Sequence, residues 1–279
     1  MFEEIFVDSS RIDAFYQDGY IYFSDGTLSP NTYVILKDHE TEEKSALARY
    51  DHHERKLVKL QHSFKDIQHK NKEQLAYLDA LSNPSIQCIA VQGPVGSGKT
   101  YIALAAGVEL VLNEERFDKI ILAKLPFEIG YHMGALPGEL NEKLDAYMTS
   151  FWDALAKILN KQGDELRTTI EDLEAWGKLE VLSISHVLGR DLSNAFVIID
   201  EAQLLNRMEL RTLLSRAGDK SKVVVCGDKD QVYRREAIGD ANGFAKMIEG
   251  FRDLDFFAYI ELRKVVRSRL AQAAAERLA

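Results

Sequence analysis

The sequence predicts an α/β protein in which a parallel sheet is flanked by helices and is preceded by a small β module. Beyond residue 86, short apolar runs alternate with segments of helical periodicity, as in strands joined by helical crossovers. Residues 19–60 instead show short aromatic or β-branched runs broken by turn residues. We therefore expect a β-rich module over residues 1–60 and one α/β domain over residues 61–279.

The elements follow in chain order. Before the large domain, residues 71–81 have helical periodicity, and Asn83-Pro84 ends that helix. The long acidic stretch 139–177 is expected to be a helical insertion on one edge of the sheet. The strands expected in the β module are 20–23, 33–36, 46–50 and 57–60. The strands expected in the large sheet are 86–91, 120–123, 179–184, 196–199, 223–226 and 256–260.

The composition is that of an ordinary globular protein. Of the 279 residues, 46% are hydrophobic and 28% are charged, which excludes global disorder and a fibrous repeat. The formal net charge of -9 argues against a surface that coats itself with nucleic acid through bulk electrostatics. Any path for nucleic acid must therefore be local.

The sequence contains neither a membrane-spanning run nor a signal peptide, which predicts a cytoplasmic protein with no membrane partner. No apolar run reaches membrane length, and the acidic start at Phe2-Glu3-Glu4 is unlike a signal peptide. Cys88 and Cys226 lie in apolar runs without metal-ligand spacing, so we interpret them as reduced core thiols. The seven histidines form no metal-binding pattern.

Residues 93–100 read Gly-Pro-Val-Gly-Ser-Gly-Lys-Thr and match the Walker A pattern. The pattern follows an apolar strand and precedes the expected helix 101–112, which is the context of a P-loop. Backbone N–H groups would surround the β-phosphate, Lys99 would reach the β- and γ-phosphates, and Thr100 would offer its hydroxyl to Mg²⁺. The alternative is a glycine-rich turn without a ligand. Together these features predict an ATP- and Mg²⁺-binding domain of the RecA-like P-loop class.

A second motif supplies acids. The apolar strand 196–199 runs into Asp200 and Glu201, as in a Walker B motif. Asp200 would complete the Mg²⁺ shell with Thr100, and Glu201 would orient or deprotonate the attacking water. The alternative is a strand that ends in solvated charge.

Two weaker signals complete the candidate site. The strand 223–226 runs into a polar loop, where Gln231 or Asp228 could contact the γ-phosphate and sense its loss; Gly-Asp is also a common turn dipeptide. Hydrolysis further needs positive charge against the transferring phosphoryl group, commonly an arginine. A cluster near the C-terminus could supply it or could start a solvated helix: Arg263, Lys264, Arg267 and Arg269.

The whole pattern resembles the PhoH family, whose members are ATPases related to superfamily-one helicases. The most distinctive part is Leu-Pro-Gly-Glu-Leu at 136–140, which a generic P-loop protein has no reason to carry. Residues 33–37 and 45–50 look like the β module that precedes the ATPase in longer members, which begin with a PIN nuclease domain. Nothing here corresponds to that domain, so ribonuclease activity is disfavoured. The segments that carry the resemblance are 93–100, 130–140, 189–192, 200–203, 227–231 and 265–267.

The resemblance implies a full set of site residues. In helicase-like relatives a glutamine ahead of the P-loop reads the adenine edge; Gln74 occupies that place, although it could be a surface helix residue. The resemblance also implies a ring of subunits, expected to be a hexamer, in which Arg267 reaches the active site in cis or across an interface. The catalytic set becomes Lys99, Glu201, Gln231 and Arg267. The nucleotide contacts become Gln74, Gly93, Pro94, Val95, Gly96, Ser97, Gly98, Lys99, Thr100 and Tyr101.

Two departures from the family pattern fall at loci proposed to contact nucleic acid or a neighbouring subunit. Residues 123–125 read Ala-Lys-Leu where the family usually has Thr-Arg-Pro, and Arg263-Lys264 replace an acidic pair. Two functional hypotheses stay open. The first is an ATPase acting on single-stranded RNA or DNA, with Lys124 and Arg190 facing the strand. The second is a regulatory ATPase that controls assembly or a protein partner without a polymer, which the acidic charge balance fits better.

Overall fold

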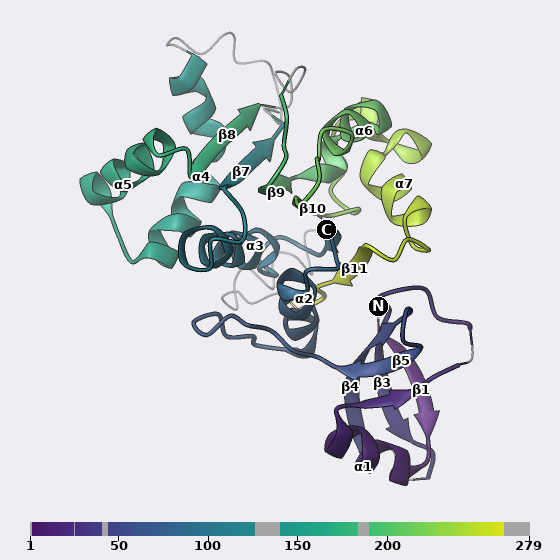
Figure 1. The fold of residues 1–279 in the computed structure, drawn as a ribbon. Coiled ribbons are helices and arrows are strands. Elements are labelled where there is room, and N and C mark those ends of the chain that lie inside the picture. Colours follow the sequence, from purple (N-terminus) through teal and green to yellow (C-terminus); the bar gives the residue numbers. More distant parts are fainter. Residues whose placement is uncertain (1, 25, 41–43, 126–139, 184–189, 265–279) are drawn as a thin grey trace.

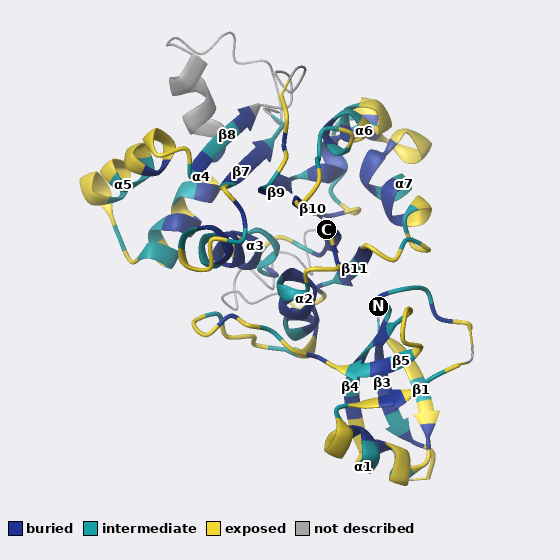
Figure 2. Ribbon diagram, viewed as in Figure 1, coloured by how far each residue is buried: buried dark blue, intermediate teal, exposed yellow. Residues whose placement is uncertain are grey.

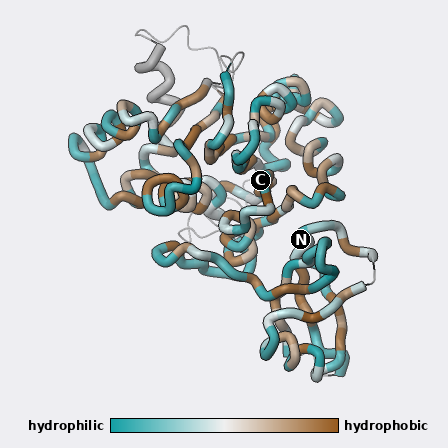
Figure 3. The backbone as a smooth tube through the Cα atoms, in the orientation of Figure 1, coloured by the Kyte–Doolittle hydropathy of each residue, from teal (hydrophilic) through white to brown (hydrophobic). Residues whose placement is uncertain are grey.

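The structure is a computed structural model, and it describes residues 2–24, 26–40, 44–125, 140–183 and 190–264. Two sheets organise these residues: a six-stranded sheet surrounded by helices, and a smaller five-stranded sheet formed by the N-terminal residues (Figure 1). Hydrophobic segments run through both sheets, while hydrophilic ones gather in the outer helices and connections (Figure 3). The predicted α/β architecture with a preceding β module is therefore confirmed.

The large sheet has the order β11-β6-β10-β9-β7-β8, and every pairing in it is parallel. Because both faces of such a sheet are covered, its central strands are mostly apolar, and β6, β9 and β10 are buried at every residue. Their polar residues lie at the strand ends: Gln92, Asp200 and Lys222. The strands are β6 Cys88–Gln92, β7 Lys119–Lys124, β8 Leu179–Ser183, β9 Ala195–Asp200, β10 Lys222–Gly227 and β11 Phe257–Glu261. All six lie where the alternation of apolar runs predicted them.

Helices cover both faces of this sheet, and each face has its own apolar core (Figure 2). One face carries α2 Lys72–Ser82, α3 Lys99–Val108 with a π-helical turn Glu109–Asn113, and α4 Leu140–Leu159. The other face carries α6 Arg207–Leu214 and α7 Gly243–Gly250. Short 3-10 turns lie at Ala202–Leu204, Arg235–Ala237 and Gly239–Ala241.

The acidic stretch differs in part from its expectation as an edge insertion. It forms two helices, α4 and α5 Gly163–Ala175. Helix α5 does lie against the edge strand β8, and most of its residues are exposed. Helix α4, however, packs on α3 and places Phe151 and Leu155 in the main core at 0% and 1% exposure. The apolar stripe of α4 therefore makes it a core helix of the domain.

The β module also contains more than the sequence indicated. Its sheet has the order β1-β3-β4-β5-β2 and is mixed, because β1 pairs parallel with β3. Helix α1 Ser9–Asp18 buries Ile12 and Phe15 against this sheet, so residues 3–18 belong to the fold. The strands are β1 Glu3–Val7, β2 Tyr20–Tyr22, β3 Tyr33–Asp38, β4 Ser45–Asp51 and β5 Lys56–Lys59. Among the described helices, none is long and apolar enough to cross a bilayer.

Candidate active site

Sheet order brings the three predicted motifs to one edge. Strand β10 lies between β6 and β9, and all three run in the same direction. Their carboxyl ends therefore meet, and the P-loop after Gln92, the acids at Asp200 and the loop beginning at Asp228 lie together. Crevices at the carboxyl ends of parallel strands are where open α/β sheets bind ligands.

The P-loop is held in a tight turn that needs its glycines. Gly96 and Gly98 have φ angles of +85° and +97°, which L side chains rarely adopt. A Cβ at Gly93 would lie 2.3 Å from the Leu262 carbonyl oxygen, so no side chain fits there without a shift. Gly98 is the residue before α3, so the first N–H groups of that helix open toward the loop.

Two polar atoms in the P-loop have the character of a ligand cradle. Lys99 Nζ lies 2.5 Å from the Gly93 carbonyl oxygen and 3.2 Å from that of Pro94, so it is folded over the loop. Ser97 Oγ is buried and has no hydrogen-bond partner among the described residues. Buried polar atoms are rarely left unpaired, and one here points to an absent ligand.

The two predicted metal ligands are in direct contact. Thr100 Oγ1 donates a 2.9 Å hydrogen bond to Asp200 Oδ1. Burial raises the pKa of Asp200, and the nearby Glu201 carboxylate raises it further, while Lys124 and the Thr100 hydroxyl oppose this shift. A hydroxyl and a carboxylate are the hard oxygen donors that Mg²⁺ prefers, and a nearby dication would stabilise the ionised carboxylate.

Glu201 belongs to a hydrogen-bonded chain that crosses the site. It adopts a left-handed conformation with φ +54°, which is uncommon for a residue other than glycine. Gln203 Nε2 donates to Glu201 Oε2 at 2.7 Å, and Gln203 Oε1 accepts from the Asp228 backbone N–H at 3.0 Å. Asp228 Oδ2 in turn accepts from Gln231 Nε2 at 2.8 Å. The chain connects both predicted γ-phosphate-side residues, Glu201 and Gln231.

Gln203 was missed as a site residue, although the sequence placed it in the Asp-Glu-Ala-Gln segment. It is 1% exposed and sits at the centre of that chain. Its position three residues after Asp200, in a turn beyond a buried strand, is a signal that could have identified it. Burial also raises the pKa of the Asp228 carboxyl group, which is expected where a carboxylate lies against a packed sheet edge.

Gln74 is not a surface residue: it is 4% exposed on α2 and packs against the P-loop. Its Nε2 donates to the Ser97 carbonyl at 3.1 Å, and its Oε1 accepts from the Lys70 N–H at 2.8 Å. A glutamine amide has two N–H donors and two acceptor lone pairs, so one of each is left over. Gln74 lines a groove of about 1010 Å³ together with Tyr101, a residue that is 43% exposed.

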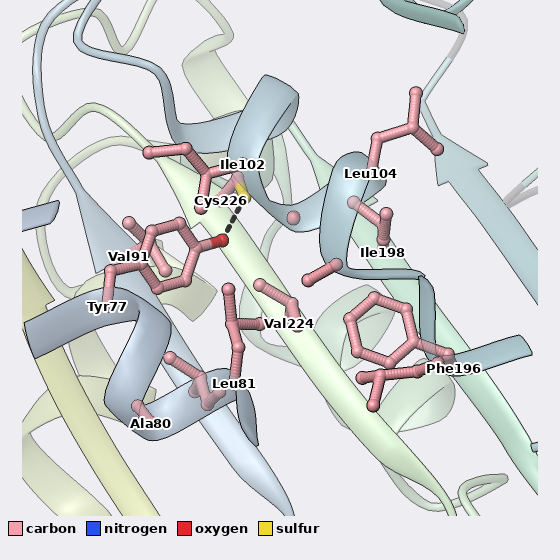
Figure 4. Packing of buried hydrophobic residues seen from close by; sticks show 14 of the residues in the cluster. Tyr77, Ala80, Leu81, Val91, Ile102, Leu104, Phe196, Ile198, Val224 and Cys226 are labelled. Carbon is pink, nitrogen blue, oxygen red and sulfur yellow. Dashed lines mark hydrogen bonds between the residues drawn. The ribbon is translucent and has the colours of Figure 1, made fainter. Parts of the chain in front are cut away.

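Tyr77, one turn further along α2, was not predicted and lies beneath the P-loop. Its hydroxyl donates to the Lys99 carbonyl at 3.2 Å and lies 4.0 Å from Cys226 Sγ. Figure 4 shows Tyr77 pointing from α2 toward Cys226 on β10, among apolar residues of the sheet and α3. Burial raises the pKa of the Tyr77 hydroxyl, so it remains a neutral donor.

The other basic residues that the sequence singled out include Lys124 and Arg190, which contact different partners. Lys124 pairs in register with Asp200 across β7 and β9, and its Nζ lies 3.2 Å from Ser150 Oγ. Arg190 forms a 3.1 Å ion pair with Glu180, away from the P-loop strand. Residues 130–139, Gly189 and the segment 265–269 with Arg267 lie outside the described residues.

These features fit a nucleotide with a divalent cation. The loop offers backbone N–H groups, an ammonium group and an unpartnered hydroxyl, while Thr100 and Asp200 offer oxygens. Within the described ranges, no group of three or more His, Cys, Asp or Glu side chains could hold a metal by itself. A Mg²⁺ ion here would therefore share its shell with phosphate and water, as it does in nucleotide enzymes. Cys88 and Cys226 are buried free thiols, and burial raises the pKa of Cys88 to about 12.

Comparisons with known proteins identify related sequences. The family model described as PhoH-like protein matches residues 66–278. Protein PhoH2 of Bacillus subtilis is 32% identical over 99% of this chain and 64% of its own length. Protein PhoH2 of Thermobispora bispora is 35% identical over 75% of this chain and 47% of its own. The PhoH-like protein of Synechocystis is 34% identical over 75% of this chain and 61% of its own.

These figures mean that the chain spans about half to two thirds of the length of these relatives. Among solved structures, the Pif1 helicase from Candida albicans aligns with 75% of this chain and 43% of its own, at 14% identity and a TM-score of 0.35. That similarity is too low to carry an argument. The family model and the sequence identities do show that the chain belongs to the PhoH-like protein family.

Proposed function

We propose that the protein binds ATP with Mg²⁺ and hydrolyses it. The observation that carries the proposal is the contact between Thr100 and Asp200 beside the folded-over Lys99. In this assignment residues 93–101 surround the phosphates, and Lys99 neutralises charge on the β- and γ-phosphates. The metal, when bound, would withdraw negative charge from the phosphate oxygens. Residues 61–279 act as the ATPase domain, and residues 1–60 as an appended module.

Glu201 is the group proposed to position or deprotonate the attacking water. Its side chain is held by Gln203, and the same chain of hydrogen bonds reaches Gln231 through Asp228. Loss of the γ-phosphate would change the contacts of Gln231, and the hydrogen-bonded chain would pass this change to the position of the Glu201 side chain. Arg267 is proposed to stabilise charge on the transferring phosphoryl group, from its own subunit or from a neighbour.

Gln74 is proposed to select adenine. Its unused N–H and lone pair match the acceptor and donor that adenine presents side by side, and the amide lies at the wall of the groove. Tyr101 would cover the base or ribose from α3. Guanine presents an acceptor where adenine has its amino group, so the same amide would fit it poorly.

ATP hydrolysis is proposed to be coupled to the binding or unwinding of single-stranded RNA or DNA, in a cytoplasmic ring of subunits such as a hexamer. The family membership and the helicase-like motifs support this reading. The acidic net charge of -9 favours the second candidate, a regulatory ATPase that controls assembly or a protein partner. A polymer requirement separates the two candidates.

The deciding experiment measures steady-state ATP hydrolysis with and without single-stranded RNA and DNA, on protein whose mass in solution is known. The control is Lys99→Ala, which should lower kcat/KM by roughly a hundredfold or more because it removes a charge at the phosphates. Turnover stimulated by a polymer, with a salt-dependent affinity, supports the nucleic-acid motor. Turnover indifferent to both polymers supports the regulatory ATPase, and turnover equal in Lys99→Ala contradicts both.

A further inference from the structure

Helix α2 holds two separate parts of the proposed nucleotide site. Gln74 and Tyr77 donate to the Ser97 and Lys99 carbonyls of the P-loop, at 3.1 and 3.2 Å. Glu73 Oε2 accepts from the backbone N–H groups that follow β11, at 3.0 Å for Arg263 and 3.4 Å for Lys264. The position of α2 therefore fixes both the base-reading amide and the start of the segment that leads to Arg267.

The β module binds the same helix near its C-terminal end, through hydrogen bonds to Asp79. Asp79 Oδ2 accepts from Tyr33 Oη at 2.9 Å and from Arg49 Nε at 3.0 Å, and both donors belong to the module. Asp79 Oδ1 accepts from the Gln61 N–H at 2.9 Å. The ion pair is largely shielded from water, with side-chain exposures of 12% for Arg49 and 5% for Asp79. Charge-assisted bonds in such a setting are strong and geometrically selective.

A second contact from the module supports the first. Asn31 accepts from Arg49 Nη1 at 3.2 Å, and its Nδ2 donates to the carbonyl oxygens of Asp255 and Phe257 at 2.7 and 3.0 Å. Phe257 begins β11, so the module is bonded both to α2 and to the neighbouring edge strand. Figure 1 shows the module lying next to these two elements. Motion of α2 relative to β11 would therefore break at least one of these two sets of bonds.

The contact of the module with Asp79 lies a short distance along α2 from Gln74 at the nucleotide groove. Asp79 lies five residues after Gln74, which is about 7.5 Å along a helix. A hydrogen-bonded helix transmits a shift or rotation along this length with little loss, because its backbone is stiff. Loss of the hydrogen bonds from Tyr33 and Arg49 to Asp79 would therefore move the Gln74 amide relative to the P-loop.

We propose that Tyr33, Arg49 and Asp79 are positioning residues for the nucleotide base, which makes the β module a determinant of ATP affinity and of ATP preference over GTP. This inference rests on the proposed ATPase function. Asp200 and Glu201, which serve the chemical step, follow β9 on the sheet and are not borne by α2. The module should therefore act mainly on nucleotide affinity, and the chemical step at saturating ATP should change little.

The test compares Tyr33→Phe and Arg49→Gln with the wild-type chain. Each variant removes a donor to Asp79 and keeps much of the side-chain volume. The matched control is Tyr50→Phe, because Tyr50 is another buried tyrosine of the module whose hydroxyl has no hydrogen bond to any described residue. Binding is measured with fluorescent methylanthraniloyl derivatives of ATP and GTP, and kcat, KM and thermal unfolding are measured on the same samples.

We expect both variants to raise the Kd for the ATP derivative by about fivefold, the effect of one lost hydrogen bond, and to lower the preference over the GTP derivative. The kcat at saturating ATP should stay within about twofold of wild type, and Tyr50→Phe should match wild type. Unchanged Kd and preference would overturn the inference, as would loss of stability or kcat without a change in preference. A wild-type chain that binds neither nucleotide would instead refute the proposed function itself.

Discussion

Thr100 and Asp200, which are 100 residues apart in sequence, are joined by a 2.9 Å hydrogen bond from the hydroxyl to the carboxylate. Thr100 lies in the first turn of α3 behind the P-loop, and Asp200 is the last residue of β9. Strand β10 lies between β6 and β9 in the sheet. The contact brings two hard oxygen donors, a hydroxyl and a carboxylate, to one point beside Lys99.

Glu201→Gln should separate binding from hydrolysis. An amide keeps the size of the side chain but cannot take a proton from water, so kcat should fall by about 10²- to 10⁴-fold while ATP still binds. Single-turnover hydrolysis and nucleotide binding by equilibrium titration measure the two effects. Glu171→Gln, on the exposed face of α5, is the control and should match wild type. Robust turnover by Glu201→Gln would remove that residue from the water-activating role.

Asp200→Asn should stabilise the metal-free protein at neutral pH and abolish Mg²⁺-dependent turnover. The pKa of Asp200 is raised by burial, so the folded state holds this proton more tightly than the unfolded chain does. The stability from that proton is fully present below the usual aspartate pKa, and it is lost as pH rises through the raised value. Asparagine cannot ionise and avoids the loss.

Thermal unfolding in EDTA, compared from acidic to neutral pH, tests the Asp200 prediction. The Tm difference between Asp200→Asn and wild type should grow as pH rises through the raised pKa, and added Mg²⁺ with ATP should stabilise only the wild type. Nucleotide affinity of the wild type in Mg²⁺ should also weaken as pH falls, because a ligating carboxylate must lose its proton. A constant Tm difference across this range would contradict the proposed burial of charge.

Gln203→Ala should slow turnover more than it weakens ATP binding. It leaves the buried Asp228 N–H unpaired and frees the Glu201 side chain, at a cost of about 1–3 kcal/mol in the free energy of unfolding. The corresponding fall in Tm is roughly 2–4 °C per kcal/mol. Gln162→Ala, at an exposed position before α5, controls for the loss of an amide. If Gln203→Ala changed KM but left kcat unchanged, Gln203 would not position Glu201.

Arg267→Ala should reduce kcat by roughly 10³-fold without lowering Tm, if Arg267 supplies the transition-state charge. Arg269→Ala is the neighbouring control. Mixing the inactive Arg267→Ala and Lys99→Ala proteins tests the location of the arginine: recovery of activity in mixed assemblies places it across a subunit interface. Loss of folding in Arg267→Ala would make the residue structural.

Much of the fold could be predicted from the sequence because the physical signals are local. The apolar runs that became β6, β9 and β10 are fully buried, and strands buried on both faces read as near-continuous apolar runs. The P-loop was predictable for the same reason, since its glycines are required by positive φ angles at Gly96 and Gly98. By contrast, α4 was misplaced at the edge, because an amphipathic period shows that a helix packs but not on which surface.

The sequence by itself determined which residues form the phosphate loop and which strands end in acids, because these depend on spacing within a few residues. Only the tertiary structure decided that Gln203 links Glu201 to Asp228 and that Asp79 accepts hydrogen bonds from Tyr33 and Arg49. Those contacts join residues from separate elements, and their partners are set by strand order and by how a helix seats on the sheet. Neither is written in a local pattern, because packing selects among many arrangements that the same periodicity allows.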